Sequence, residues 1–190
     1  MAQSQPPPAS DEHLLAAFHK GDRAALGALA VRYEPPLLGL ATGILRGRTD
    51  LARDAVQDTW IKVIRHGHSF AGNSSFKTWI YRIVINRCRD LLAREQRAAQ
   101  YADPSYAPPE SAAEPPPLLA SQHVELNGTL RSAVDRLAES HRLIILLCYH
   151  RGLTHTEAAE VLAIPVGTLK SRLNAALTEL RSTLGIEVLP

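Results

Sequence analysis

The chain has 190 residues, of which 45% are hydrophobic and 21% are charged, and its formal net charge is +2 at pH 7. This length suits one or two compact domains, and the nearly balanced charge does not by itself indicate a class of partner. The sequence has no run of about eighteen apolar residues, and its N-terminus lacks the basic start and apolar core of a signal peptide. We therefore expect a cytoplasmic protein with no membrane insertion.

The two cysteines, Cys88 and Cys148, lie far apart in the sequence and lack CxxC spacing. They indicate neither a disulfide framework nor a zinc site, and free thiols fit a reducing cytoplasm. The neighbouring His66 and His68 have no carboxylate or thiol beside them that would complete a metal site. We expect no metal, no cofactor and no enzymatic activity.

The N-terminal part is predicted to be a disordered tail, residues 1–9, followed by helices. Ser10 is placed to cap a helix that runs to His19, and Asp22 is placed to begin a second helix that reaches Tyr33. Polar caps before apolar periodic stretches are the usual start signal of a helix.

Two consecutive prolines, Pro35 and Pro36, follow the second predicted helix. Proline has no backbone N–H, and it disfavours the helical conformation of the residue before it. We therefore predict a stop or a sharp kink at Glu34, with a new helix through Leu37 and Ile44.

The following helix is predicted to use Asp50 as its cap. It places Val56, Trp60 and Val63 toward the core at i, i+4 and i+7. Its other face carries an acidic patch with an amide, formed by Asp54, Gln57 and Asp58. Because negative charge in the first turns suits the helix dipole, this patch is either a solvated face or a binding surface.

A turn-rich loop, residues 66–75, leads into a helix that starts at Phe76 and should end near Arg94. One face of this helix carries a polar and basic stripe at i, i+4 and i+7, formed by Arg82, Asn86 and Arg89. Two roles are possible for the aromatic loop residue Phe70. It either anchors the loop in the core or offers a face on which an unstacked base of single-stranded DNA would lie.

Basic residues are concentrated between Trp60 and Arg97. The bases in this stretch are Lys62, Arg65, Lys77, Arg82, Arg87, Arg89, Arg94 and Arg97. Only Asp90 and Glu95 oppose them, so the near-neutral total conceals a local surplus that is suited to phosphate contact.

A change in composition marks the boundary between two modules. Residues 98–121 contain no Lys or Arg and are rich in proline, with several acidic residues among them. Such a stretch cannot pack a core, so we predict a flexible linker.

The second module has a more specific pattern. Residues 142–150 enclose a nearly continuous apolar run that predicts a buried helix, which Gly152 follows. Thr154 and Glu157 have the spacing of a capping box, so a short helix should begin there. Pro165 then stands where the first residue of another helix is expected.

This last helix should have a core side and a polar side. The core side is formed by Leu169, Leu173, Ala176 and Leu180, and the polar side by Gly167, Lys170, Ser171 and Asn174. Two short helices joined by a tight turn, with small, polar and basic residues leading the second, favour a DNA-binding helix-turn-helix over a plain helical bundle.

Several segments together resemble the extracytoplasmic-function (ECF) group of RNA polymerase sigma factors in the sigma-70 family. They are DAVQDTW at 54–60, SFAG at 69–72, FKTWIYRI at 76–83 with Asn86, and PVGTLKSRL at 165–173. The resemblance implies an all-α protein of two small helical domains. Sigma region 2 would span residues 10–97 and sigma region 4 residues 122–186, with the linker 98–121 between them.

The resemblance also implies partners and site residues. The partners would be core RNA polymerase, promoter DNA and an anti-sigma factor. The polymerase-binding residues would be Asp54, Gln57 and Asp58, and the −10 DNA-binding residues Lys62, Phe70, Arg82 and Asn86. The −35 DNA-binding residues would be Gly167, Thr168, Lys170, Ser171, Arg172 and Asn174.

One departure from the family pattern affects the recognition helix. Further arginines commonly follow the SRL segment in this family, whereas this chain has Ala175 and Leu177 there. The lower charge predicts weak binding of the isolated module to a −35 element.

Three other classes of protein account for the sequence less well. An enzyme using Cys88 or a histidine would need a base and an orienting partner beside the nucleophile. A helix-turn-helix repressor would account for the second module but not for the basic, aromatic-flanked first module. A sigma-like decoy would need an added receiver domain, for which 190 residues leave no room.

Overall fold

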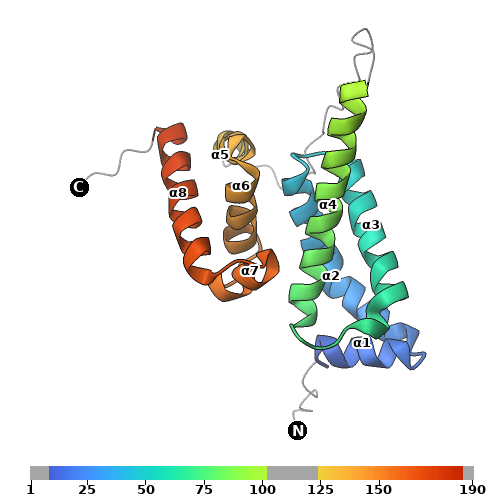
Figure 1. Cartoon of the computed structure of the whole chain (residues 1–190). Helices are drawn as coiled ribbons and strands as arrows, with labels where there is room; N and C mark the ends of the chain where they lie inside the picture. Colours follow the sequence, from blue (N-terminus) through green and yellow to red (C-terminus); the bar gives the residue numbers. More distant parts are fainter. Residues whose placement is uncertain (1–8, 102–123, 186–190) are drawn as a thin grey trace.

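A computed structural model describes residues 9–101 and 124–185, and all regular structure in these two ranges is helical (Figure 1). The first module contains α1 (Asp11–His19), α2 (Arg23–Ile44), α3 (Thr49–His66), the short 3-10 helix η1 (Gly67–Ser69) and α4 (Phe76–Tyr101). The second module contains α5 (Val124–Arg136), α6 (Glu139–Ile145), the π-helical turn η2 (Leu146–His150), α7 (His155–Leu162) and α8 (Val166–Leu184). The all-α architecture of two helical modules is thus confirmed.

The predicted caps of the first two helices are present. The hydroxyl of Ser10 accepts a hydrogen bond from the backbone N–H of His13 at 3.2 Å. The carboxylate of Asp22 accepts from the N–H of Ala24 at 2.9 Å. Both side chains therefore satisfy amides that the first turn of a helix leaves without a partner.

The predicted stop at Glu34 is wrong, because α2 continues through Pro35 and Pro36 to Ile44. Each proline removes one internal hydrogen bond. Burial on both sides of the prolines favours the continuous helix, since Leu29 and Tyr33 before them and Leu37, Leu40 and Ile44 after them all lie in the core.

Asp50 does not cap α3, contrary to the prediction. The helix begins at Thr49 after an N-cap at Arg48 that makes no side-chain cap bond, and Asp50 lies in the first turn. The chain reverses just before this point through Arg46 and Gly47, whose φ angles are 55° and 86°. The tight reversal starts the helix two residues earlier than a cap at Asp50 would.

The helix α4 extends beyond the predicted end near Arg94 and reaches Tyr101. The first four residues of the predicted linker, 98–101, are therefore helical. The remaining linker residues, 102–121, and residues 1–8 of the predicted tail lie outside the described residues.

In the first module α2, α3 and α4 lie side by side, and α1 packs against one end of this group near η1 (Figure 1). The side chains at its centre are fully buried: Leu29, Leu37, Leu40, Ile44, Phe76 and Ile80. The second module buries the predicted core side of α8, formed by Leu169, Leu173, Ala176 and Leu180, against α5, α6 and α7.

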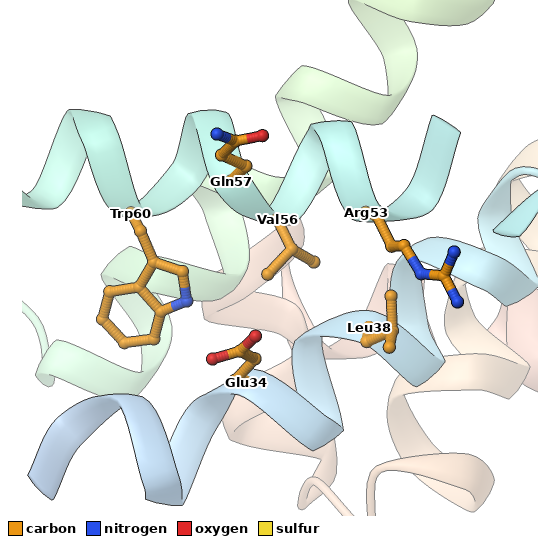
Figure 2. A pocket seen from close by; sticks show the side chains of 6 residues that line it. All are labelled: Glu34, Leu38, Arg53, Val56, Gln57 and Trp60. Carbon is orange, nitrogen blue, oxygen red and sulfur yellow. The ribbon is translucent and has the colours of Figure 1, made fainter. Parts of the chain in front are cut away.

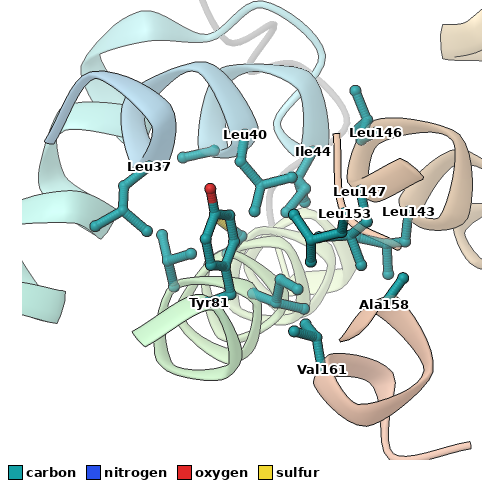
Figure 3. Close-up of a cluster of buried hydrophobic side chains, with 14 of the residues drawn as sticks. Leu37, Leu40, Ile44, Tyr81, Leu143, Leu146, Leu147, Leu153, Ala158 and Val161 are labelled. Carbon is teal, nitrogen blue, oxygen red and sulfur yellow. The ribbon is translucent and has the colours of Figure 1, made fainter. Parts of the chain in front are cut away.

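The buried apolar side chains continue from one module into the other (Figure 3). Leu37, Leu40 and Ile44 of α2 and Tyr81 of α4 lie in the same cluster as Leu146, Leu147 and Leu153 of the second module. The helices α4 and α7 also pack together. The two modules are therefore in direct contact in this structure.

The buried helix predicted for residues 142–150 is present as α6 followed by η2, and its last turn is π-helical. The sequence pattern gave no sign of this π turn. Among the described residues, no helix combines the length and the apolar character needed to cross a bilayer.

Candidate functional site

The acidic patch of Asp54, Gln57 and Asp58 lies on α3, opposite the face that buries Val56 and Val63. Asp54 and Gln57 are exposed. Asp58 is partly buried, and its carboxylate accepts a hydrogen bond from Nε of Arg87 on α4 at 2.6 Å. The patch therefore contains two side chains that face solvent and one that joins two helices.

A pocket of about 420 Å³ lies between α2 and α3, beside this patch (Figure 2). Its lining residues are Glu34, Leu38, Arg53, Val56, Gln57 and Trp60. The indole Nε1 of Trp60 is buried without a hydrogen-bond partner. Figure 2 shows the Trp60 ring and the Glu34 carboxylate reaching into the gap from opposite helices.

This pocket offers an apolar floor with polar groups at its edge, an arrangement suited to a side chain from a partner protein. Gln57 belongs both to the pocket and to the predicted patch. Glu34 and Leu38 were not predicted as site residues, because they belong to a helix that the prolines were expected to break. Because α2 is continuous, Glu34 and Leu38 lie opposite α3 and line the pocket.

Phe70 follows η1 and is partly buried against two aromatic residues of α4. Its ring centroid lies 5.3 Å from that of Trp79 and 6.4 Å from that of Phe76. These contacts are those of a loop anchor, one of the two alternatives for this residue. Trp79, which sequence analysis did not single out, is the closer of its two neighbours.

The polar stripe of α4 is brought together with acidic elements of the second module. Nε of Arg82 donates to the backbone carbonyl of Glu160 at 3.0 Å, and Nη2 donates to the same oxygen. Nε of Arg89 pairs with Glu139 at 2.7 Å. Between these two arginines, Asn86 is exposed.

Other basic residues of the first module differ in their surroundings. Lys62 is exposed on α3. Lys77, in the first turn of α4, donates to the carboxylate of Glu157 at 2.9 Å. The structure therefore places Lys77 in the same contact region as Arg82 and Arg89.

The predicted capping box at the start of α7 is confirmed. The backbone N–H of Glu157 donates to the hydroxyl of Thr154 at 3.2 Å, and the N–H of Thr154 donates to the Glu157 carboxylate at 2.8 Å. The backbone hydrogen bond from Thr154, together with the one from Lys77, lowers the pKa of Glu157 to about 2. The carboxylate is consequently charged at neutral pH.

The turn between α7 and α8 is short. Ala163 ends α7 in the left-handed conformation with a φ of 53°, and Pro165 is the N-cap of α8. Pro165 was predicted to be the first residue of this helix, but the first helical residue is Val166. The two helices and their tight turn have the arrangement of a helix-turn-helix.

The leading turns of α8 present the predicted residues at the surface. Those that are exposed are Gly167, Lys170, Ser171, Arg172 and Asn174, and Thr168 is partly buried. The hydroxyl of Ser171 donates to the carbonyl of Thr168 at 3.0 Å. Ala175 is exposed, whereas Leu177 packs against the core. The burial of Leu177 gives a physical reason why no arginine stands at that position.

The described residues contain no cluster of three or more His, Cys, Asp or Glu side chains that would hold a metal ion. Cys88 is fully buried, and burial raises the pKa of its thiol to about 12. Burial also raises the pKa of Cys148, which is only partly buried. Both thiols are free and protonated at neutral pH.

Comparison with protein families and with individual proteins gives a consistent result. The family model described as Sigma-70 region 2 matches residues 29–98, and the one described as Sigma-70, region 4 matches residues 133–182. The RNA polymerase sigma-H factor of Pseudomonas aeruginosa is 30% identical over 173 residues, which cover 86% of this chain and 88% of that protein. The ECF RNA polymerase sigma-E factor of Escherichia coli K12 has the same identity and coverage.

Two solved structures are similar to this one over most of their length. The sigma factor RpoE of Bartonella quintana, in complex with the anti-sigma factor NepR, has a TM-score of 0.71 and 26% identity, over 85% of this chain and 98% of that one. CnrH, in complex with the cytosolic domain of CnrY, has a TM-score of 0.69 and 27% identity, over 95% of this chain and all of that one.

Proposed function

Because the chain belongs to the sigma-70 family as a member of its ECF group, we propose that its first module binds core RNA polymerase and opens the −10 element while its second module reads the −35 element. The observation that carries this proposal is the presence, in one chain, of an acidic patch beside a pocket, a basic and aromatic surface, and a helix-turn-helix. A protein that only bound DNA through its helix-turn-helix would need neither the acidic patch with its pocket nor the basic and aromatic surface.

The polymerase-binding surface is assigned to the acidic patch and the adjoining pocket. Asp54 and Gln57 are exposed, and Gln57 also lines the pocket that holds the unpaired Nε1 of Trp60. A partner helix with basic residues and one inserted apolar side chain would match both features. Such an anchor in a pocket with a polar rim is typical of energetically important contacts.

Strand opening is assigned to Lys62, Phe70, Arg82 and Asn86. Phe70 packs on Trp79, and Asn86 lies seven residues further along α4, about 10 Å away on the same side of the helix. The Phe70 ring would stack on one extruded base, and the exposed amide of Asn86 would contact the DNA further along the same helix. Removing a base from the duplex costs a few kcal/mol of stacking, which this stacking on Phe70 would offset.

Recognition of the −35 element is assigned to the leading turns of α8. Lys170, Ser171 and Asn174 would meet base edges or phosphates in the major groove, and Arg172 a phosphate. Gly167 and Thr168 lie at the N-terminal end of the helix, where backbone N–H groups favour a phosphate. The exposed Ala175 contributes no charge, so binding by this module alone would be weak.

An anti-sigma factor is the expected regulatory partner. One of the two solved structures described above is a sigma factor in complex with a protein named as an anti-sigma factor, and the other is CnrH in complex with the cytosolic domain of CnrY. The chain would act in the cytoplasm, where polymerase and chromosomal DNA are found, and it would carry out no chemical step of its own.

The decisive experiment is run-off transcription with purified core polymerase, this chain and a pool of genomic promoter fragments. We expect discrete transcripts that depend on the chain, because promoter choice is the activity proposed. A repressor or an enzyme would yield none. Absence of any chain-dependent transcript, with an active polymerase preparation, would overturn the proposal.

A further inference from the structure

The N-terminal helix α1 lies across the end of the first module at which α4 begins (Figure 1). Beside it runs the Phe70 segment, residues 67–75, which contains η1 and the ring that we assign to an extruded base. In addition to α2, α1 contacts η1 and α4. It lies before residue 29, where the match to the Sigma-70 region 2 family model begins. The contacts of α1 with the Phe70 segment are therefore a feature of this chain that the family match does not describe.

Glu12 of α1 caps the start of α4. Its Oε1 accepts a hydrogen bond from the backbone N–H of Phe76 at 2.9 Å, although the two residues are 64 positions apart. The first turn of α4 has no acidic residue of its own, whereas the free N–H groups of a first turn favour a negative charge. Ser75 satisfies another of these groups, because its hydroxyl accepts from the N–H of Thr78 at 3.1 Å. The first N–H group of α4 thus depends on a carboxylate from α1.

The residue before Glu12 fixes α1 to α2. The carboxylate of Asp11 accepts hydrogen bonds from the hydroxyl of Tyr33 and from the guanidinium of Arg32. Burial and the hydrogen bond to Asp11 raise the pKa of Tyr33, so its hydroxyl stays protonated and donates. The rings of Tyr33 and Phe76 meet edge to face, with centroids 5.3 Å apart. Two consecutive carboxylates of α1 therefore hold two residues of different helices whose rings contact each other.

The other end of the Phe70 segment also packs on α1. A Cβ atom added at Gly67 would lie 2.6 Å from Nε2 of His19 and 3.1 Å from Cδ1 of Leu15. Leu15 belongs to the core, with 3% exposure. The φ angle of Gly67 is −63°, which any residue adopts, so glycine serves close approach at this position rather than an unusual conformation. The rings of His19 and His68 are also in contact, with centroids 6.2 Å apart.

Phe70 lies between these two attachments to α1. Its backbone N–H donates to the carbonyl of Gly67 at 3.1 Å, and its ring centroid lies 6.4 Å from that of Phe76. Each of these two neighbours is itself held by α1. A ring that is fixed before DNA arrives loses little conformational freedom when it stacks on a base, so this pre-organisation would favour capture of the base.

We propose that α1 positions the Phe70 segment for strand opening, and that Glu12 is a positioning residue that acts through the start of α4 without contacting DNA. The attachment of the segment to α1 stands independently of the proposed function, whereas its effect on strand opening rests on that function. A purely local role for Glu12, which also suits the dipole of α1 from its first turn, would leave the Phe76 N–H unaffected by its loss.

Amide hydrogen exchange of the full chain, followed by NMR without polymerase or DNA, tests the attachment. Glu12→Ala removes the acceptor, and Glu12→Gln keeps an acceptor oxygen without the charge. His13→Ala, at an exposed position of the same helix, is the matched control. We expect the Phe76 N–H to exchange about five-fold faster in Glu12→Ala than in the wild type, as for the loss of an ordinary N-cap. Glu12→Gln should lie between the two, and His13→Ala should match the wild type.

The N–H of Val84, a fully buried residue in the middle of α4, serves as the internal reference and should change much less than that of Phe76. Unchanged exchange at Phe76 in Glu12→Ala would refute the attachment. Equal acceleration at Phe76 and Val84 would refute it as well, because it would indicate a loss of overall stability rather than a local release.

Promoter opening by the holoenzyme tests the consequence, with 2-aminopurine fluorescence for opening and gel shift for duplex binding. We expect Glu12→Ala to lower opening by about the same five-fold factor, with duplex binding unchanged, and Glu12→Gln to recover most of the loss. Full opening by Glu12→Ala, or an equal loss in both steps, would contradict the positioning role. Run-off transcription with the wild type decides the proposed function separately, and the exchange measurement needs neither polymerase nor DNA, so the two failures are distinguishable.

Discussion

Arg87 donates from Nε to the carboxylate of Asp58 at 2.6 Å, and this ion pair ties α4 to α3 within the first module. One member of the acidic patch is therefore also a packing residue. A charge reversal at Asp58 would change both the stability of the fold and the charge of the surface, so tests of polymerase binding should use Asp54 and Gln57, whose side chains are exposed.

The double variant Asp54→Lys, Gln57→Ala should lose co-purification with core polymerase, because it removes the exposed part of the patch. Its melting temperature should stay close to that of the wild type, since surface changes seldom exceed about 0.5 kcal/mol. Asp90→Lys, a charge reversal at an exposed position of α4, is the matched control and should retain polymerase. In contrast, Asp58→Asn should lower the stability by up to about 1 kcal/mol. Retention of polymerase by the double variant would refute the assignment of the patch.

Asn86→Ala should impair promoter opening more than the initial binding of duplex DNA. Asn86 is exposed on α4, so its loss should not disturb the core. Opening is measured by the fluorescence of 2-aminopurine placed in the −10 element, and duplex binding by gel shift with polymerase holoenzyme. Asp90→Ala, one turn further along the same helix, serves as the control. An equal loss in both steps would mean that Asn86 has no specific part in strand opening.

Lys170→Ala should weaken binding of the holoenzyme to a −35 element by about 1–3 kcal/mol, the usual cost of losing one base or phosphate contact. Arg181→Ala removes the same charge from the same helix eleven residues further on, about 16 Å away, and should have little effect. The measurement is a binding titration at several salt concentrations. If Lys170 contacts a phosphate, its loss should also reduce the salt dependence by about one unit of slope. Equal effects of the two variants would indicate only a general attraction to DNA.

Cys88 should resist thiol reagents in the folded protein. Its side chain is fully buried, and burial raises its pKa to about 12, so the reactive thiolate is scarce at pH 8. Titration with Ellman's reagent should therefore modify at most the partly buried Cys148 in the native protein, and both thiols in denaturant. Cys88→Ser shows which thiol is protected, because this variant should lose only the thiol that reacts in denaturant. Rapid modification of both thiols under native conditions would contradict this expectation.

Acid should weaken the α7 cap through Glu157. Hydrogen bonds from the Thr154 N–H and from Lys77 hold the pKa of this carboxyl at about 2, below its ordinary 4.5. Because the folded pKa is the lower one, the stabilising contribution of the carboxylate is complete above pH 4.5 and is lost as the pH falls from 4.5 toward 2. Urea unfolding at a series of pH values should show a steeper acid loss for the wild type than for Glu157→Gln, with Glu160→Gln as the control exchange on the same helix. Parallel pH profiles of the wild type and Glu157→Gln would disprove this linkage.

Local signals predicted those parts of the fold in which a few neighbouring residues decide the outcome. Ser10, Asp22 and the Thr154–Glu157 box each satisfy amides within their own first turn, so spacing along the sequence was sufficient. Pro35 and Pro36 show the limit of such reasoning. Their local preference was overridden by tertiary burial of α2 on both sides, which no window around the prolines contains.

The candidate site also has parts that local sequence patterns predict and parts that they do not. The polar face of α8 follows from helical spacing alone, and the structure exposes it as predicted. The pocket between α2 and α3 and the partners of Arg82 and Arg89 depend on which helices meet in space. Contacts between side chains of different helices leave no trace in the periodicity of either segment.

The π turn of η2 has a further consequence for how this chain tolerates changes in length. A π turn is equivalent to one residue inserted into an α-helix, so the residues after it, beginning with Arg151, are rotated by about 100° relative to an uninterrupted helix. Deleting a single residue from 146–150 would remove that offset and turn Arg151 away from the Pro36 carbonyl, to which it donates a hydrogen bond. The register of this short segment thus sets the orientation of the helix-turn-helix toward α2. Single-residue insertions or deletions in 146–150 should therefore be far less tolerated than conservative substitutions.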